Sequence, residues 1–312
     1  MSACGGGGED APPDAGRRRD SAPALPATRV AKVVLDEELQ RRIEMIKYDT
    51  TLETRPIPKR PVLPPAMPTR AKLVAITKYI VQFEYNHTGA AYFCMKRDRG
   101  LKHVTTTAKE IIREALPIQC VEAVFLACFL TSEMRDLDRY PLSFKSQAGE
   151  SSHRHIVLAV HDKNKNLWGA LGISRKNSLM HKDLKYASLS DLVANYKQSY
   201  EDCRHDLTKV YVGLPLDHNP HSIEAVRWRV LKLNLCGSAW ACIADALDGY
   251  VRDLARAVKS QGEGCLAKFK PAKAEDKDDA ASSDDEPPAA TPEALLPKRP
   301  DDTPPRRPVI GV

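Results

Sequence analysis

One stretch, residues 117–130, constrains the fold more than any other. After Pro117, every residue up to Leu130 is apolar or a good helix former. Proline lacks a backbone N–H and suits the first position of a helix, so the stretch predicts a mostly buried helix from Pro117 with Cys120 in its first turn. The positive end of a helix lowers the pKa of a thiol, which makes Cys120 a candidate nucleophile. A structural cysteine is the alternative, because free cysteines are among the most buried residues.

The eight cysteines form no C-x-x-C pair, and their spacing indicates neither a disulfide framework nor a zinc ribbon. We therefore expect reduced thiols in a cytoplasmic protein. No apolar run approaches transmembrane length, and the N-terminal residues lack the apolar core of a signal peptide. These features predict no membrane association, no metal and no cofactor.

Charge is unevenly distributed along the 312 residues. The net charge is +6, but residues 272–302 contain ten acidic and four basic side chains, so the remainder carries +12. A basic body with an acidic tail predicts an anionic partner, and nucleic acid, an acidic peptide and an anionic membrane all fit this pattern.

Composition and periodicity predict an α+β protein with three parts. Residues 1–28 and 261–312 have low-complexity compositions typical of disordered tails. Residues 29–260 form the folded domain, with a helical part at 29–135 packed on an antiparallel sheet that lies within 136–260. Further predictions are helices at 30–48, 69–84, 107–115 (leading directly into the Cys120 helix), 189–207 and 238–258, a proline-rich spacer at 55–69, and strands at 209–214 and 226–233.

A β-hairpin is predicted where residues 153–161 and 167–174 both alternate between apolar and polar. With a loop at 163–166, Asp162 lies opposite Leu167 and His155 lies opposite Ser174. One face then carries large apolar side chains and is expected to be core. The other face is small apart from His155, which leaves room beside the imidazole.

A cysteine at a helix start followed by a histidine on a strand is typical of thiol hydrolases and acyltransferases. The histidine takes the thiol proton, and a third group orients the ring. Ser174 could accept a hydrogen bond from Nδ1–H of His155. The residues alone leave a second interpretation open, in which His155 is an ordinary histidine on a half-exposed strand.

Two other clusters suggest different chemistry. Cys203 and His205 together with His218 and His221 have loosely metal-like spacing, although a loop beside the hairpin also explains them. The basic residues near the hairpin could bind nucleic acid, but no aromatic platform accompanies them.

Six segments of the sequence carry a resemblance to a known family: Tyr85–Gly89 (YNHTG), Glu114–Cys120 (EALPIQC), Ser143–Lys145 (SFK), Arg154–Leu158 (RHIVL), Gly169–Arg175 (GALGISR) and Asn219–Ser222 (NPHS). They closely resemble segments of the vasohibins, which are tubulin tyrosine carboxypeptidases with a transglutaminase-like (papain-like) cysteine protease core. The segments keep one order and similar spacing from about Leu73 to Trp228, and the resemblance fades toward the ends.

The resemblance implies removal of the C-terminal tyrosine of α-tubulin by a Cys120–His155–Ser174 triad. It implies that Tyr85 helps to hold the oxyanion and that Arg175 binds the terminal carboxylate of the substrate. Basic positions then line a groove for the acidic tubulin tail; they are Lys96, Arg97, Lys145 and Arg154. It also implies association with microtubules and with a small helical vasohibin-binding protein, for which the helices at 30–48 and after Thr69 are candidate docking sites.

Gln119 departs from the family pattern, which has a carboxylate-binding lysine just before the cysteine. A charged hydrogen bond is worth about 1–2 kcal/mol more than a neutral one, so carboxylate affinity is expected to fall roughly tenfold or more. The choice of terminal residue is therefore less constrained than the reaction class. Acyl transfer of the transglutaminase kind and a non-catalytic microtubule-binding scaffold are the alternative functions.

Overall fold

The computed structural model describes residues 56–261, together with Glu38, Arg41, Arg42, Met45, Leu266, Phe269 and Lys270. The chain divides into two compact units, residues 1–54 and 55–312, and the fold below belongs to the second. The predicted helix at 30–48 lies outside the described residues except for its four described positions, which are helical. The two predicted tails also lie outside them, apart from the few positions named above.

Three helices form one layer: α2 (Thr69–Val81), α3 (Leu101–Glu114) and α4 (Cys120–Leu130). The predicted apolar face is confirmed, because all five of its residues are buried; they are Leu73, Ile76, Tyr79 and Ile80 on α2 and Phe83 just after it. Helix α4 is apolar almost all round and is buried among α2, α3 and the sheet. This central position fixes its first residue, Cys120, relative to the rest of the layer.

Helix boundaries differ from the prediction at several points; α5 (Leu189–Asp202), for instance, ends five residues before the predicted end at 207. Helix α2 begins at Thr69, with Pro68 as its N-cap, and ends at Val81, three residues before the predicted end at 84. Helix α3 begins at Leu101, six residues earlier than expected, and Ala115 ends it in the left-handed conformation with φ of 51°. The chain does not continue directly into the next helix, so Pro117 is not its first residue; α4 begins at Cys120 with Gln119 as N-cap. The prediction that Cys120 lies in the first turn is confirmed.

Six antiparallel strands form one sheet in the order β4-β3-β2-β1-β5-β6. Their bounds are β1 (Leu137–Ala148), β2 (Ser151–Asp162), β3 (Leu167–Leu171), β4 (Lys182–Tyr186), β5 (Asp206–Val212) and β6 (Leu231–Asn234). The two strands predicted at 209–214 and 226–233 are present with shifted ends. The sequence predicted neither β1 nor β4.

The central strand β1 contains a proline, which concealed it from the sequence pattern. Pro141 cannot donate to a neighbouring strand. Its carbonyl accepts from the N–H of Gly213 at 2.8 Å. The carbonyl of Gly213 receives its hydrogen bond from the Tyr250 hydroxyl at 2.9 Å instead of from a strand N–H. A proline is tolerated here because a side chain from another element supplies the missing donor.

The predicted hairpin register is confirmed. Asp162 pairs with Leu167, and the ladder continues from His161 opposite Trp168 to Leu158 opposite Leu171. The polar turn is built on Asp162, whose carboxylate accepts from the N–H groups of Asn164 and Lys165. Strand β3 ends at Leu171, so Ser174 lies beyond the paired region.

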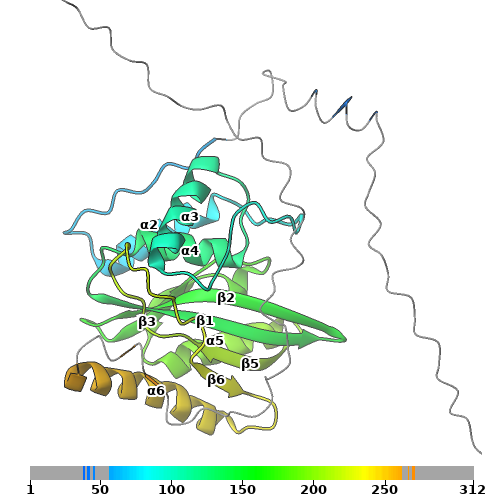
Figure 1. The fold of residues 1–312 in the computed structure, drawn as a ribbon. Coiled ribbons are helices and arrows are strands. Elements are labelled where there is room, and N and C mark those ends of the chain that lie inside the picture. The colour runs from blue at the N-terminus through cyan, green and yellow to red at the C-terminus, as the bar shows by residue number, and fades with distance from the viewer. Residues whose placement is uncertain are drawn as a thin grey trace, which may run out of the picture. The chain divides into compact units, whose positions relative to one another are not determined.

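Both faces of the sheet are covered, which makes a three-layer α+β arrangement (Figure 1). Helices α2–α4 cover the face with Ile156 and Leu158. Helices α5 (Leu189–Asp202) and α6 (Trp240–Gln261) cover the other face. The sequence had suggested an open second face of the hairpin, but its small residues, such as Val157, Ala159 and Ala170, are buried in a second core. The large apolar face is core, as predicted.

Candidate active site

The segment before α4 is held by a short parallel bridge between Tyr85 and Ile118. The N–H of Asn86 donates to the Ile118 carbonyl at 2.8 Å, and the N–H of Ile118 donates to the Glu84 carbonyl at 3.1 Å. One residue later, the N–H of Gln119 donates to the buried carboxylate of Glu122 at 3.3 Å. The backbone on both sides of Cys120 is thus fixed, and the Cys120 N–H at the helix start needs no intrahelical acceptor.

The Cys120 side chain is partly exposed and lies next to strand β2. Burial raises the pKa of its thiol, and the nearby carboxylate of Glu122 adds to this rise. Hydrogen bonding to the backbone of Ile156, Cys120 and Val121 lowers the pKa in part. The resting cysteine is therefore a neutral thiol at neutral pH, which needs a base to become a nucleophile.

His155 is the base that the geometry offers. Its Nε2 lies 2.8 Å from the carbonyl oxygen of Leu179, and its ring stacks on Phe144 with centroids 6.4 Å apart at 17°. Burial lowers the pKa of His155 to about 4, so the ring is neutral at physiological pH. A carbonyl only accepts hydrogen bonds, so Nε2 carries the proton and Nδ1 is left as the basic nitrogen.

Cys120 and His155 line one pocket of about 330 Å³. Six basic side chains line the same pocket: Arg97, Lys145, Arg154, Lys209, Arg229 and Lys232. None of the described residues that line it is acidic. A pocket with this charge favours a negatively charged ligand over a neutral or cationic one.

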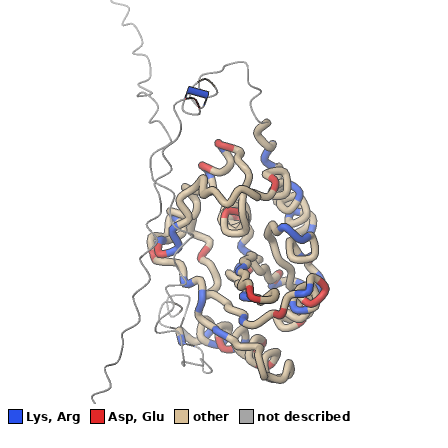
Figure 2. Tube along the Cα trace, turned by 90° about the vertical axis from the view of Figure 1, so that its right-hand side faces the viewer, with Lys and Arg blue, Asp and Glu red and all other residues tan. Residues whose placement is uncertain are grey.

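Sheet pairing explains why four of these cations gather. Lys145 pairs with Arg154 on β2 and with Lys209 on β5. Two residues earlier on β1, Ser143 pairs with Tyr211, which in turn pairs with Lys232 on β6. Basic residues occur in many separate segments of the described chain, with acidic ones at other positions (Figure 2). The strands bring together basic residues that are far apart in sequence.

Arg97 and Arg229 reach the pocket from loops. The carbonyl of Arg97 accepts from the indole N–H of Trp228 at 2.7 Å, and Trp228 stacks on Phe125 of α4 with centroids 5.8 Å apart. The guanidinium of Arg229 lies 5.0 Å from the centre of the Tyr211 ring. Both arginine loops are therefore tied to the core that positions Cys120.

Tyr85 and Arg175 form a second group beside the thiol. The Arg175 guanidinium lies 5.5 Å from the centre of the Tyr85 ring. Burial is the main cause that raises the pKa of Tyr85, and Cys120 adds to the rise, whereas Arg175 opposes it. The Tyr85 hydroxyl therefore stays protonated and can donate a hydrogen bond, and the exposed Arg175 can accept an anion.

Of the residues predicted from sequence, the pocket brings together Cys120, His155, Lys145, Arg154 and Arg97. Gln119 is adjacent as the N-cap of α4. Tyr85, Lys96, Ser174 and Arg175 do not line the pocket. The hydroxyl of Ser174 accepts from the N–H of Lys176 at 3.3 Å. The roles of all these residues, including the place of Ser174 in a triad, stay predictions.

Sequence reasoning missed three cations of the pocket and the orienting carbonyl of Leu179. Lys209 and Lys232 could have been found by alternation within the predicted strands, because Lys209 and Tyr211 share a face. Their proximity to Lys145 required the unpredicted strand β1. Arg229 and the Leu179 carbonyl left no pattern in the sequence.

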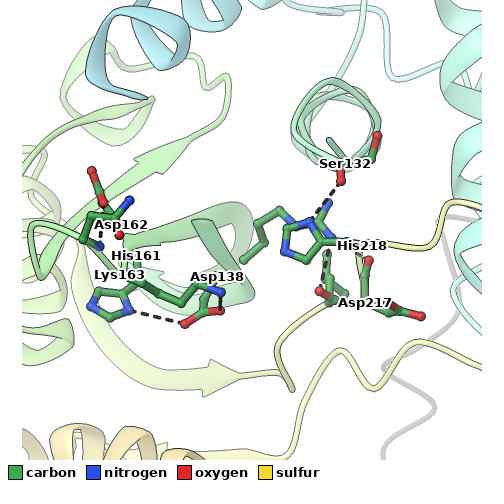
Figure 3. Close-up of polar contacts among 10 residues, drawn as sticks. Ser132, Asp138, His161, Asp162, Lys163, Asp217 and His218 are labelled. Carbon is green, nitrogen blue, oxygen red and sulfur yellow. Dashed lines mark hydrogen bonds and ion pairs between the residues drawn. The ribbon is translucent and has the colours of Figure 1, made fainter. Parts of the chain in front are cut away.

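Cys203, His205, His218 and His221 are the residues whose spacing in the sequence is loosely metal-like. Within the described part of the chain, no three His, Cys, Asp or Glu residues are grouped to hold an ion. His218 faces the carbonyl of Ser132, with its Nδ1 3.0 Å away (Figure 3). His205 instead contacts the Ser146 hydroxyl at 3.2 Å.

Among the described residues, no helix has both the length and the apolar character needed to cross a membrane.

Comparison with known proteins identifies the family. The vasohibin family model matches residues 27–255. The mouse (Mus musculus) protein tubulinyl-Tyr carboxypeptidase 1 is 37% identical over 230 residues. The match covers 74% of this chain but 60% of the mouse protein, so the chain spans less than two thirds of its relative's length. The chain belongs to the vasohibin family.

Proposed function

We propose that this protein is a cysteine carboxypeptidase that removes the C-terminal tyrosine of α-tubulin. One observation carries the proposal: a thiol at a helix start and a neutral histidine share a pocket whose charged lining is entirely basic among the described residues. The name of the mouse relative, a tubulinyl-Tyr carboxypeptidase, supports the same substrate. The acidic tail of tubulin matches the charge of the pocket.

The reaction starts when Nδ1 of His155 takes the proton of the Cys120 thiol. The sulfur attacks the carbonyl carbon of the peptide bond before the terminal tyrosine, and the carbonyl oxygen becomes an oxyanion. In this proposal the N–H of Cys120 and the hydroxyl of Tyr85 donate to it. The histidine then protonates the leaving amine, free tyrosine departs, and water, deprotonated by His155, hydrolyses the thioester.

Exopeptidase action requires a group that binds the terminal carboxylate of the substrate. Arg175 suits this role because a guanidinium pairs a carboxylate bidentately, and it lies over Tyr85 beside the thiol. Gln119 contributes at most a neutral hydrogen bond where the family has a lysine. The Arg175 contact therefore carries more of the selectivity for a free C-terminus.

The cations of the pocket bind the acidic residues that precede the scissile bond. In this proposal the orienting role expected of Ser174 falls to the carbonyl of Leu179, which accepts from Nε2 of His155, and Lys96 extends the basic surface. The protein acts on microtubules in the cytoplasm. A small helical vasohibin-binding protein is the proposed partner for the helical part of the chain.

Release of free tyrosine from microtubules tests the proposal. Wild type and Cys120→Ala are compared, and Cys242→Ala is the matched control because Cys242 is an exposed thiol on α6, away from the pocket. Wild type and Cys242→Ala should release tyrosine, and Cys120→Ala should not. The assay is run with and without a small vasohibin-binding protein.

A peptide with the tubulin tail sequence and an amidated C-terminus is the substrate control. It should not be cleaved, because it lacks the carboxylate that Arg175 binds. Incorporation of an amine without tyrosine release would favour acyl transfer. Microtubule binding without either reaction would favour a scaffold.

A further inference from the structure

Three consecutive backbone carbonyls beside His155 are each bound by a different side chain. The Ser178 carbonyl accepts from Nζ of Lys182 at 2.7 Å. The Leu179 carbonyl accepts from Nε2 of His155 at 2.8 Å. The Met180 carbonyl accepts from the hydroxyl of Tyr196 at 2.6 Å. The carbonyl that orients the imidazole is thus held from both neighbouring peptides.

We propose that Lys182, assisted by the hydroxyl of Tyr196, is a positioning residue that sets the imidazole of His155 for proton transfer. The inference rests on the proposed function only in taking Cys120 and His155 as the reacting pair. Lys182 does not line the pocket that contains them, so it acts through the backbone of residues 178–180 and not on the substrate.

The segment that Lys182 holds is too short to fix itself. It is a single 3₁₀ turn, η1 (Asn177–Leu179), with two internal hydrogen bonds, from Leu179 N–H to the Lys176 carbonyl and from Met180 N–H to the Asn177 carbonyl. Isolated 3₁₀ turns have weak hydrogen-bond geometry. The direction of the Leu179 carbonyl therefore depends on contacts from outside the turn.

Lys182 itself is held in one position. Its Nζ also donates to the Ser199 hydroxyl at 3.0 Å, and it lies 4.8 Å from the centre of the Tyr196 ring. A lysine with two acceptors and an aromatic face loses the freedom of a surface lysine. Strand β4, which carries Lys182, and helix α5, which carries Tyr196 and Ser199, thus act on the turn together.

Tyr196 also contacts the aromatic ring that stacks on His155. Its ring contacts Phe144 with centroids 4.8 Å apart, and Phe144 stacks on His155. The imidazole is therefore fixed on its face by Phe144 and at Nε2 by Leu179, and both supports lead back to Tyr196. A small shift of a catalytic group can cost about 100-fold in rate, so such supports have measurable effects.

The test measures alkylation of Cys120 by iodoacetamide, with the Cys120 peptide quantified by mass spectrometry. At neutral pH the reaction depends on His155 as base, whereas at about pH 9.5 a larger share of the thiol ionises without help. Lys182→Met should lower the neutral rate at least about tenfold and leave the alkaline rate within about twofold of wild type. Tyr196→Phe, which removes one oxygen atom, should also lower the ratio of the neutral rate to the alkaline rate, but by a smaller factor than Lys182→Met. Lys182→Arg should have a ratio of neutral to alkaline rate close to that of wild type.

Lys185→Met is the matched control, because Lys185 lies on the same strand and also sits over a ring, that of Tyr186 at 5.5 Å. Its rate ratio should equal that of wild type. An unchanged ratio in folded Lys182→Met and Tyr196→Phe, or the same fall in Lys185→Met, would overturn the inference. A protein that shows the expected ratios but releases no tyrosine would contradict the proposed substrate and leave the role of Lys182 standing.

Discussion

Nε2 of His155 donates to the carbonyl oxygen of Leu179 across 2.8 Å. Because a backbone carbonyl has no proton to give, this bond fixes the tautomer of the neutral ring. Nδ1 is left without a proton and can accept one from the Cys120 thiol. In the proposed mechanism a backbone carbonyl thereby performs the orienting role that a carboxylate or amide side chain has in many thiol hydrolases.

Stability should fall in acid because of His155. Burial lowers its pKa from 6.5 to about 4, so between these values the unfolded chain binds a proton that the folded protein does not. Unfolding is therefore favoured as pH falls from about 6.5, and the loss is complete below about 4. The free energy of unfolding should fall by about 1–3 kcal/mol in all. The lower figure allows for solvent screening of the half-buried ring.

Urea unfolding of wild type and His155→Gln from about pH 4 to 8 measures this contribution. Glutamine keeps a donor for Leu179 but does not titrate. Above about pH 7 the two proteins should differ in free energy of unfolding by a constant amount, since the histidine is neutral in both the folded and the unfolded state. Parallel stability curves through the acid range would refute the prediction.

Local features of the fold were predictable from sequence, and those that depend on pairing between distant segments were not. The register of β2 and β3 follows from a polar turn built on Asp162, and the position of Cys120 follows from the apolar run after it. Both signals lie within a few residues of the feature they predict. Pro141 concealed β1 because the donor that replaces its missing N–H comes from Tyr250, more than a hundred residues later.

The candidate site shows the same division between features that the sequence predicts and features that it does not. Cys120 and His155 have side chains whose chemistry is visible in the sequence. The Leu179 carbonyl is a group that every residue has, so only the structure distinguishes it. Lys209 and Lys232 carry visible charges, but their association with Lys145 depends on strand order.

Arg175→Ala should abolish release of tyrosine while leaving Cys120 reactive. The guanidinium is exposed and sits over Tyr85, so its removal takes away the carboxylate contact without opening the core. Iodoacetamide has no carboxylate, so its reaction with Cys120 should stay within about twofold of wild type, since a point charge at an exposed site shifts a neighbouring thiol little.

Arg175→Lys separates charge from geometry. Lysine keeps the positive charge but cannot make the bidentate contact, so KM should rise by about tenfold or more. Tyrosine release by Arg175→Ala at the wild-type rate would remove Arg175 from the carboxylate role.

Binding of the tubulin tail should weaken with salt, and the cations on β5 and β6 should carry part of this dependence. Lys209 and Lys232 line the pocket from these two strands. The expected rise in KM is about two- to fivefold for each of Lys209→Gln and Lys232→Gln at low ionic strength, which corresponds to the loss of one exposed ion pair. At about 0.5 M salt the variants and wild type should converge, because the Debye length is then only a few ångströms.

Lys165→Gln and Lys259→Gln are the matched controls for this experiment. Both lysines are exposed and lie outside the pocket, in the β2–β3 turn and in the last turn of α6. Each change removes the same charge from the protein, so any effect of net charge alone appears in all four variants. A rise in KM confined to Lys209→Gln and Lys232→Gln places the acidic tail along β5 and β6, whereas equal effects in the four variants would show that only the overall charge attracts the substrate.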